Sequence, residues 1–186
     1  MLLARMIAPI QSLGPGKRLG LWFQGCSKNC YGCMSPELQI YDSTKNVPIK
    51  VLLPIIESEM VRNECTGLTI SGGDPFEQPE ELYELLKALR PIFNDILVYT
   101  GFSYQEIKES KIMSMSLEFI DVLIDGRYIE KQNTGNSRLY GSDNQNIYYL
   151  NSKVKRKYEI YNKEEHQLET FMHNNKVITI GIQKRG

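Results

Sequence analysis

The chain has 186 residues, of which 41% are hydrophobic and 24% charged, and its 22 basic side chains balance its 22 acidic ones. This composition is typical of a globular domain, and a chain of this length buries enough surface to fold without disulfides. Zero net charge excludes a general electrostatic attraction to nucleic acid or to an anionic membrane. We therefore expect no nucleic-acid partner.

We expect neither a membrane span nor a secretory signal. The longest apolar run, residues 51–56, contains Pro54 and is far shorter than the roughly 18 residues that a span requires. The first ten residues include Arg5 and are not followed by a small-residue cleavage site. These features predict a cytoplasmic protein, and in that reducing compartment clustered cysteines bind metals or act in catalysis more often than they form disulfides.

Apolar runs alternate with helical patterns in the first two thirds of the chain. Four runs predict β-strands, at residues 18–24, 67–71, 95–100 and 119–124. Apolar side chains at helical spacing predict helices over residues 48–63 and 79–90, and Ser103 with Glu106 forms a capping box that begins a third helix. Strands that alternate with such helices are parallel and joined by right-handed crossovers. The sequence therefore predicts an α/β fold, either an open sheet or part of a barrel.

The pattern changes after the fourth predicted strand. Residues 131–146 are polar and rich in turn formers, and residues 167–182 predict two strands that turn at Asn174-Asn175. We interpret this tail as a β-rich cap on a single domain. The domain then spans residues 1–186, with a core at about 18–150 and a C-terminal extension at about 151–186.

The distinctive motifs all follow predicted strands. They are the cysteine loop at 25–33, Gly-Gly-Asp-Pro at 72–75, Thr100-Gly101 and Asp125-Gly126. Ligands of parallel α/β sheets bind beside the carboxyl ends of the strands. We therefore expect these four loops to meet at one site.

Cys26, Cys30 and Cys33 have the spacing C-x3-C-x2-C within one loop. A structural zinc site takes four ligands, and the two histidines, His166 and His173, are distant in the sequence. A four-iron cluster normally takes four cysteines, so three would leave one iron open to a substrate or cofactor. The pattern therefore favours an iron–sulfur cluster with an open iron over a zinc or redox site.

With these motifs, the sequence resembles the radical S-adenosylmethionine superfamily, and within it the activating proteins of anaerobic ribonucleotide reductase. The resemblance spans about residues 18–150 and is carried by residues 24–26, 33–37, 71–75, 100–102, 121–126 and 141–145. Gly32 precedes the last cysteine where many superfamily members have an aromatic residue, and Asp74 stands where many have Glu. Both variants resemble the reductase-activase branch. The resemblance implies a partial, open parallel β/α barrel of the radical S-adenosylmethionine type.

The resemblance also implies a reaction. Cys26, Cys30 and Cys33 would hold a [4Fe-4S] cluster as the catalytic centre, and its open iron would chelate the methionyl group of S-adenosylmethionine. One electron, from reduced flavodoxin or ferredoxin, would break the carbon–sulfur bond. The 5′-deoxyadenosyl radical would then abstract hydrogen from a glycine of a partner, a glycyl radical enzyme such as anaerobic ribonucleotide reductase.

By the same resemblance, the S-adenosylmethionine site would comprise Tyr31, Gly32, Cys33, Met34, Gly72, Gly73, Asp74, Thr100 and Asp125. The two glycines lack a Cβ and would let the backbone approach a charged ligand. Asp74 can pair with its ammonium group, and Tyr31 could contact adenine. Asp125 either caps the loop after its strand or reaches the cofactor.

Two other functions stay open at this point. The chain could be a radical enzyme that modifies a peptide or small molecule, or a metal-stabilised binding module without turnover. Cys65 is most simply a small buried apolar residue. The charge run of Lys153, Lys155, Arg156 and Lys157 is typical of a solvated face, and the alternative is a contact with an acidic partner. We derive no chemistry for residues 141–145.

Overall fold

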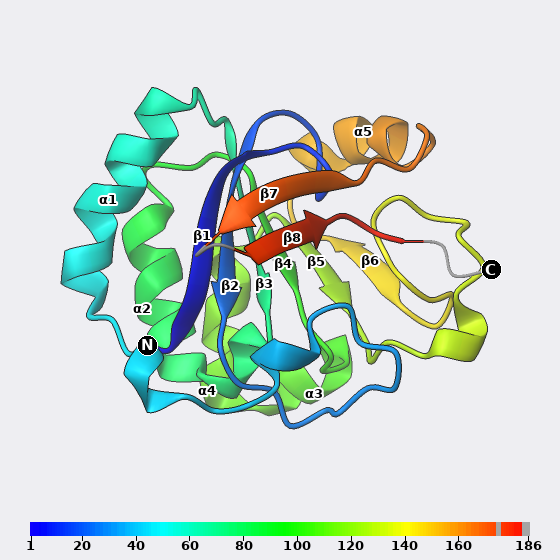
Figure 1. Ribbon diagram of the computed structural model, residues 1–186, viewed down its shortest axis with the longest axis horizontal. Coiled ribbons are helices and arrows are strands. Elements are labelled where there is room, and N and C mark those ends of the chain that lie inside the picture. The colour runs from blue at the N-terminus through cyan, green and yellow to red at the C-terminus, as the bar shows by residue number, and fades with distance from the viewer. Residues whose placement is uncertain (174–175, 184–186) are drawn as a thin grey trace.

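The computed structural model describes residues 1–173 and 176–183. Its described residues form an open central sheet of six strands, in the spatial order β1 (Leu3–Ile10), β2 (Arg18–Phe23), β3 (Gly67–Gly72), β4 (Ile96–Tyr99), β5 (Val122–Asp125) and β6 (Asn146–Tyr149) (Figure 1). The predicted α/β class is confirmed. The sheet does not close into a barrel, because β1 and β6 lie at opposite edges.

The four predicted strands are β2 to β5, and they run parallel to one another. The last of them begins later than predicted, because Ser116–Phe119 forms a 3-10 turn. Phe23 of β2 is level with Gly72 of β3, so the carboxyl ends of these strands lie side by side. Further 3-10 turns lie at Pro36–Leu38, Ser43–Lys45, Pro75–Glu77 and Glu130–Gln132.

The two edge strands, β1 and β6, were not predicted. β1 pairs antiparallel with β2, and β6 pairs antiparallel with β5. Most of their residues are only half-buried or exposed, so neither strand has the continuous apolar run of a buried strand. The first ten residues, in which we expected no secretory signal, contain β1 of the sheet.

The helices of the described residues are α1 (Ile49–Arg62), α2 (Pro79–Leu89), α3 (Tyr104–Glu109), α4 (Lys111–Met115) and α5 (Ser152–Tyr161). Successive side chains of a strand point to opposite faces of the sheet. In β4, Ile96 and Val98 belong to the core that includes α1 and α2, whereas Leu97 packs with Val154 and Tyr158 of α5. The sheet is therefore covered on both faces. Among the described residues, no helix combines the length and hydrophobicity that crossing a bilayer would require.

The C-terminal extension is a helix followed by a hairpin. The predicted strand pair is confirmed as β7 (Glu169–His173) and β8 (Lys176–Ile180), which pair antiparallel. The predicted turn at Asn174-Asn175 lies outside the described residues. The expectation of a β-rich cap missed α5, whose buried Val154, Tyr158 and Tyr161 form a helical stripe between the basic residues.

A buried ion pair joins α5 to the amino end of the sheet. Arg18 is completely buried, and its Nη1 lies 2.8 Å from Asp95 Oδ2. The Tyr158 hydroxyl donates to Asp95 Oδ1 at 2.7 Å, and Lys157 Nζ lies 2.5 Å from Asp95 Oδ2. Lys155 also has an intramolecular partner, Glu159, at 3.7 Å. Two of the four basic residues, Lys155 and Lys157, therefore form ion pairs within the chain.

Asp95→Asn should lower the free energy of unfolding by about 3–5 kcal/mol, because it leaves the buried Arg18 without its counter-charge. Burial favours a higher pKa for Asp95, but Arg18, Lys157 and Tyr158 outweigh it and the pKa is lowered. The carboxylate therefore stabilises the fold above the ordinary aspartate pKa of about 4, and this contribution is lost as pH falls through the lowered value. Urea unfolding between pH 3 and 7 measures both effects; equal stability of the two proteins would contradict the prediction.

Candidate functional site

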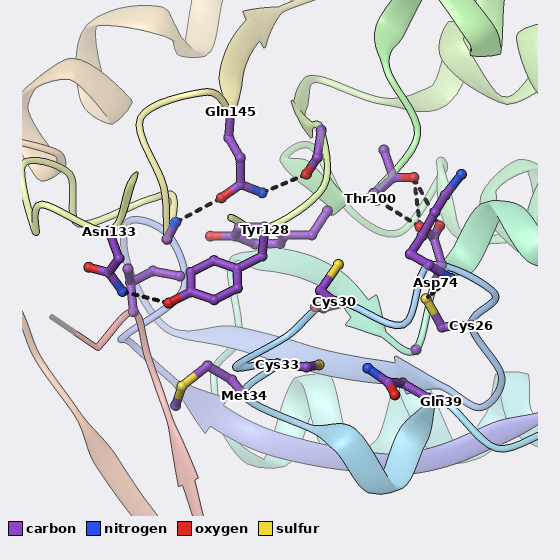
Figure 2. A pocket seen from close by; sticks show the side chains of 18 of the residues that line it. Cys26, Cys30, Cys33, Met34, Gln39, Asp74, Thr100, Tyr128, Asn133 and Gln145 are labelled. Atoms are coloured by element: carbon purple, nitrogen blue, oxygen red, sulfur yellow. Dashed lines mark hydrogen bonds between the residues drawn. The ribbon is translucent and has the colours of Figure 1, made fainter. Parts of the chain in front are cut away.

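The four loops expected to meet do so around one cavity at the carboxyl ends of β2 to β5 (Figure 2). All three clustered cysteines line it, together with Gly73 and Asp74 after β3, Thr100 and Gly101 after β4, and Gly126 after β5. Cys65 is buried at the other end of the sheet, just before β3. The predicted convergence is confirmed, and Cys65 is separate from the other three cysteines.

The cysteine loop places all three of its cysteines beside the cavity. Gly32 has a φ of 73°, a left-handed conformation that glycine adopts without strain, and the Cys33 N–H donates to Cys30 O at 3.2 Å. The Lys28 N–H donates to Cys26 Sγ at 3.4 Å. Cys26, Cys30 and Cys33 are all half-buried, and all three line the cavity.

The surroundings of Cys26 favour the protonated form of its thiol. Burial raises the pKa of its thiol to about 11, and the nearby carboxylates of Asp74 and Glu77 act in the same direction. A metal that binds the sulfur displaces this proton.

The donor set fits an iron–sulfur cluster by its chemistry. Iron–sulfur clusters are held by cysteine thiolates, and three cysteines line this one cavity. Within residues 1–173 and 176–183, no three Cys, His, Asp or Glu side chains form a group that could hold one metal ion.

Three neighbouring loops hold the cysteine loop in place. Glu77, after β3, accepts hydrogen bonds from the Ser27 N–H at 3.0 Å and from the Ser27 hydroxyl. Lys28 Nζ lies 3.3 Å from the centre of the Phe102 ring, after β4. Arg127, after β5, donates to Lys28 O at 2.5 Å. Sequence reasoning missed Glu77; its only signal was a carboxylate three residues after Asp74 in the same loop.

Asp74 connects two of these loops. It is 1% exposed, and it accepts hydrogen bonds from the Thr100 hydroxyl at 2.9 Å and from the backbone N–H groups of Gly101 and Phe76 at 2.7 and 3.0 Å. Burial raises the pKa of its carboxyl to about 6, against the opposing effect of these hydrogen bonds. Both carboxylate oxygens of Asp74 therefore accept hydrogen bonds that position the loops after β3 and β4 around the cavity.

Gly72 and Gly73 allow the strand ends to touch each other. A Cβ on Gly72 would lie 2.2 Å from the Phe23 backbone nitrogen, and a Cβ on Gly73 would lie 2.2 Å from Gly25 O. The Gly73 N–H donates to Phe23 O at 2.8 Å. The space beside each Cα is filled by the backbone of β2 and the cysteine loop, so these glycines have a packing role, and their contact with a ligand stays a prediction.

The Asp125 side chain is hydrogen-bonded to the start of α3 and to β6, and it is not among the described residues that line the cavity. It is 2% exposed and accepts hydrogen bonds from the Tyr104 N–H at 2.7 Å and from Asn146 Nδ2 at 3.0 Å. Of the two roles left open by the sequence, the structure shows the capping one. Tyr31 is 84% exposed, and neither it nor Gly32, Gly72 or Asp125 is among the described residues that line the cavity.

Residues 141–145 close one side of the cavity. Gln145 Oε1 accepts from the Gly141 N–H at 2.9 Å, and its Nε2 donates to Gly126 O at 2.8 Å (Figure 2). Both Gly141 and Gln145 line the cavity. The two hydrogen bonds of the Gln145 side chain thus give residues 141–145 a structural role that the sequence alone did not indicate.

Two polar atoms beside the cavity have no hydrogen-bond partner within the described part of the chain. They are the Tyr99 hydroxyl and Asn133 Oδ1, both buried. Both residues line the cavity, and Met34, Tyr128, Ile182 and Gln183 complete that side. Because buried polar atoms normally have a partner, these two fit a polar ligand in the cavity. Sequence reasoning did not find either residue.

Comparisons with known proteins agree with this site. The model of a 4Fe-4S single cluster domain family matches residues 12–148. Proteins named anaerobic ribonucleoside-triphosphate reductase-activating protein are similar over most of the chain. The one from Enterobacteria phage T4 is 31% identical over 142 residues, which cover 73% of this chain and 85% of the phage protein. The Vibrio cholerae protein is 31% identical over 73% of this chain and 89% of its own. The Escherichia coli K12 protein is 28% identical over 74% of this chain and 91% of its own. The chain therefore belongs to the family of anaerobic ribonucleoside-triphosphate reductase-activating proteins.

Proposed function

We propose that this protein is a radical S-adenosylmethionine activase, which generates a glycyl radical on a partner enzyme, the anaerobic ribonucleotide reductase. The observation that carries the proposal is the loop with three cysteines at the carboxyl edge of the sheet, all lining one cavity. Family membership supports the same partner. Cys26, Cys30 and Cys33 would hold a single [4Fe-4S] cluster, with one iron left for S-adenosylmethionine.

A cluster held by these cysteines and reduced by flavodoxin or ferredoxin would supply the one electron for cleaving the carbon–sulfur bond of S-adenosylmethionine to methionine and a 5′-deoxyadenosyl radical, which would take a hydrogen atom from the partner's glycine. The chain's own residues position these groups. Glu77, Lys28 and Arg127 fix the cysteine loop. Asp74 joins the loops after β3 and β4.

We propose that S-adenosylmethionine is bound by cavity residues from the expected set and by two that the structure adds. The former are Met34, Gly73, Asp74 and Thr100, and the latter are Tyr99 and Asn133. Burial raises the pKa of the Tyr99 hydroxyl, so it stays protonated and can donate a hydrogen bond. Asn133 Oδ1 can accept one.

Tyr99→Phe should weaken S-adenosylmethionine binding about fivefold, the equivalent of one hydrogen bond of about 1 kcal/mol. Iron content should not change, and stability should not fall, because the hydroxyl has no partner within the described residues. Equilibrium binding to the iron-loaded protein measures the effect. Tyr161→Phe is the matched control: its hydroxyl donates to Gln11 O outside the cavity, so it should lose stability but keep its affinity. Parent-like affinity of Tyr99→Phe would contradict the assignment.

Cofactor cleavage tests the chemistry itself. The protein, prepared without oxygen, should be brown, contain about four irons per chain, and slowly form 5′-deoxyadenosine from S-adenosylmethionine after reduction. A colourless protein that binds zinc and leaves S-adenosylmethionine intact would overturn the proposed function in favour of a binding module.

A further inference from the structure

A second hollow lies next to the cluster cavity. It is a groove of about 850 Å³ between β8 and the segment that follows the last cysteine. Val177, Ile178 and Thr179 form one wall, and Ile40 and Tyr41 are among the residues of the other. Figure 1 shows β8 as the strand of its hairpin that lies nearer to the cysteine loop.

The wall formed by β8 is the free edge of a sheet. In the described part of the chain, β8 pairs only with β7, so the hydrogen-bonding groups of its other edge have no partner strand. Such an edge is a template for an added extended chain, which it binds through backbone hydrogen bonds while alternate side chains enter pockets. The partner that this chemistry fits is an extended polypeptide.

The groove is open, and apolar side chains lie on both of its walls. Ile40, Tyr41 and Val177 are 69%, 54% and 67% exposed, and large apolar side chains that cluster at the surface mark interaction sites. The lining also contains charged side chains: Arg5 forms an ion pair with Glu37, and Asp42 and Lys45 lie farther along the same segment. A bound segment would therefore meet apolar side chains from β8 and from residues 40–41 beside charges of both signs.

The groove adjoins the cavity that the cysteines line. Met34, the residue after the last cysteine, lines the groove, the cluster cavity and a third, smaller hollow. Tyr99 and Ile182 line both the smaller hollow and the cluster cavity. A chain bound along β8 would thus lie beside Met34, at the boundary that the groove shares with the cavity.

We propose that the free edge of β8 receives the glycine-bearing segment of the partner enzyme as an added strand, and that the groove guides this segment to the cluster cavity. The inference rests on the proposed function and adds to it a docking surface. The hairpin lies outside residues 12–148, the part matched by the family model. The C-terminal extension, rather than the part of the chain that the family model matches, would then select the substrate.

Val177→Glu tests the proposal, because it places a charge in the groove without touching the cysteine loop. We expect the concentration of reductase subunit needed for half-maximal radical formation to rise about tenfold. Iron content and 5′-deoxyadenosine formation without the partner should equal those of the parent. Met172→Glu is the matched control: Met172 is the cross-strand neighbour of Val177 and is 72% exposed, but it lines a different hollow. Met172→Glu should change the concentration of reductase subunit needed for half-maximal radical formation by less than twofold.

Amide hydrogen exchange of the unaltered iron-loaded protein gives an independent measurement. Adding the reductase subunit should slow exchange in residues 176–180 and 34–45. Unchanged exchange there, or equal effects of the two glutamate variants, would overturn the docking site. If the parent protein produces a radical on the reductase and Val177→Glu does so equally well, the docking site fails while the proposed function stands. If the parent protein produces no radical on the reductase, the proposed function itself is contradicted, and the docking site that rests on it falls with it.

Discussion

Each of the variants Cys26→Ala, Cys30→Ala and Cys33→Ala should lose the cluster and, with it, all cleavage of S-adenosylmethionine. A site with three cysteine ligands has no spare thiolate, and within the described residues the only other cysteine, Cys65, is buried at the opposite end of the sheet. Iron analysis and visible absorbance of protein prepared without oxygen measure the loss.

Cys65→Ala is the control for this series. Its side chain belongs to the hydrophobic core, so its removal should cost some stability but leave iron content and cofactor cleavage intact. Loss of iron in Cys65→Ala, or retention of a full four-iron cluster in any of the other three variants, would show that the proposed ligand set is wrong.

Gly73→Ala should reduce iron content severalfold, although glycine supplies no ligand. The added Cβ would lie 2.2 Å from Gly25 O and 2.5 Å from Leu38 O, which are backbone atoms at the two ends of the cysteine-bearing segment. The segment must shift, and overpacking of this kind typically costs about 1–3 kcal/mol. Iron content and the free energy of unfolding are the quantities to measure.

Gly101→Ala is the matched control for this substitution, because Gly101 lines the same cavity. The Cβ there would lie 3.0 Å from Lys28 Cγ, an atom of a flexible side chain that can move. This variant should keep its iron. A Gly73→Ala protein with full iron and weakened S-adenosylmethionine binding would instead mean that Gly73 makes room for the ligand, as the sequence first suggested.

The central part of the fold could be predicted because its signals are local. The strands β2 to β5 are short apolar runs with a glycine, aspartate or threonine at the last strand residue or within two residues after it, and parallel topology brings these ends together. The edge strands could not be predicted in this way, since half-buried residues leave a weak pattern. In α5 the basic run hid the apolar stripe of Val154, Tyr158 and Tyr161.

The candidate site was predictable to the level of its loops but not of each side chain. The cysteine spacing identified the ligands we propose, and the loop positions identified Asp74 and Thr100 as neighbours. Whether a loop residue faces the cavity or the protein depends on long-range contacts, as Asp125 shows through its bonds to Tyr104 and Asn146. Tyr99 ends a buried strand and gave no signal beyond that of a core residue.

Electron paramagnetic resonance of the partner subunit tests the central claim most directly. The reduced, iron-loaded protein would be mixed with S-adenosylmethionine and the anaerobic ribonucleotide reductase subunit of the same organism. We expect a carbon-centred glycyl radical on the reductase and faster formation of 5′-deoxyadenosine than without the reductase. If the reductase shows no radical signal while a short peptide or a free metabolite consumes the deoxyadenosyl radical stoichiometrically, the activase assignment is contradicted.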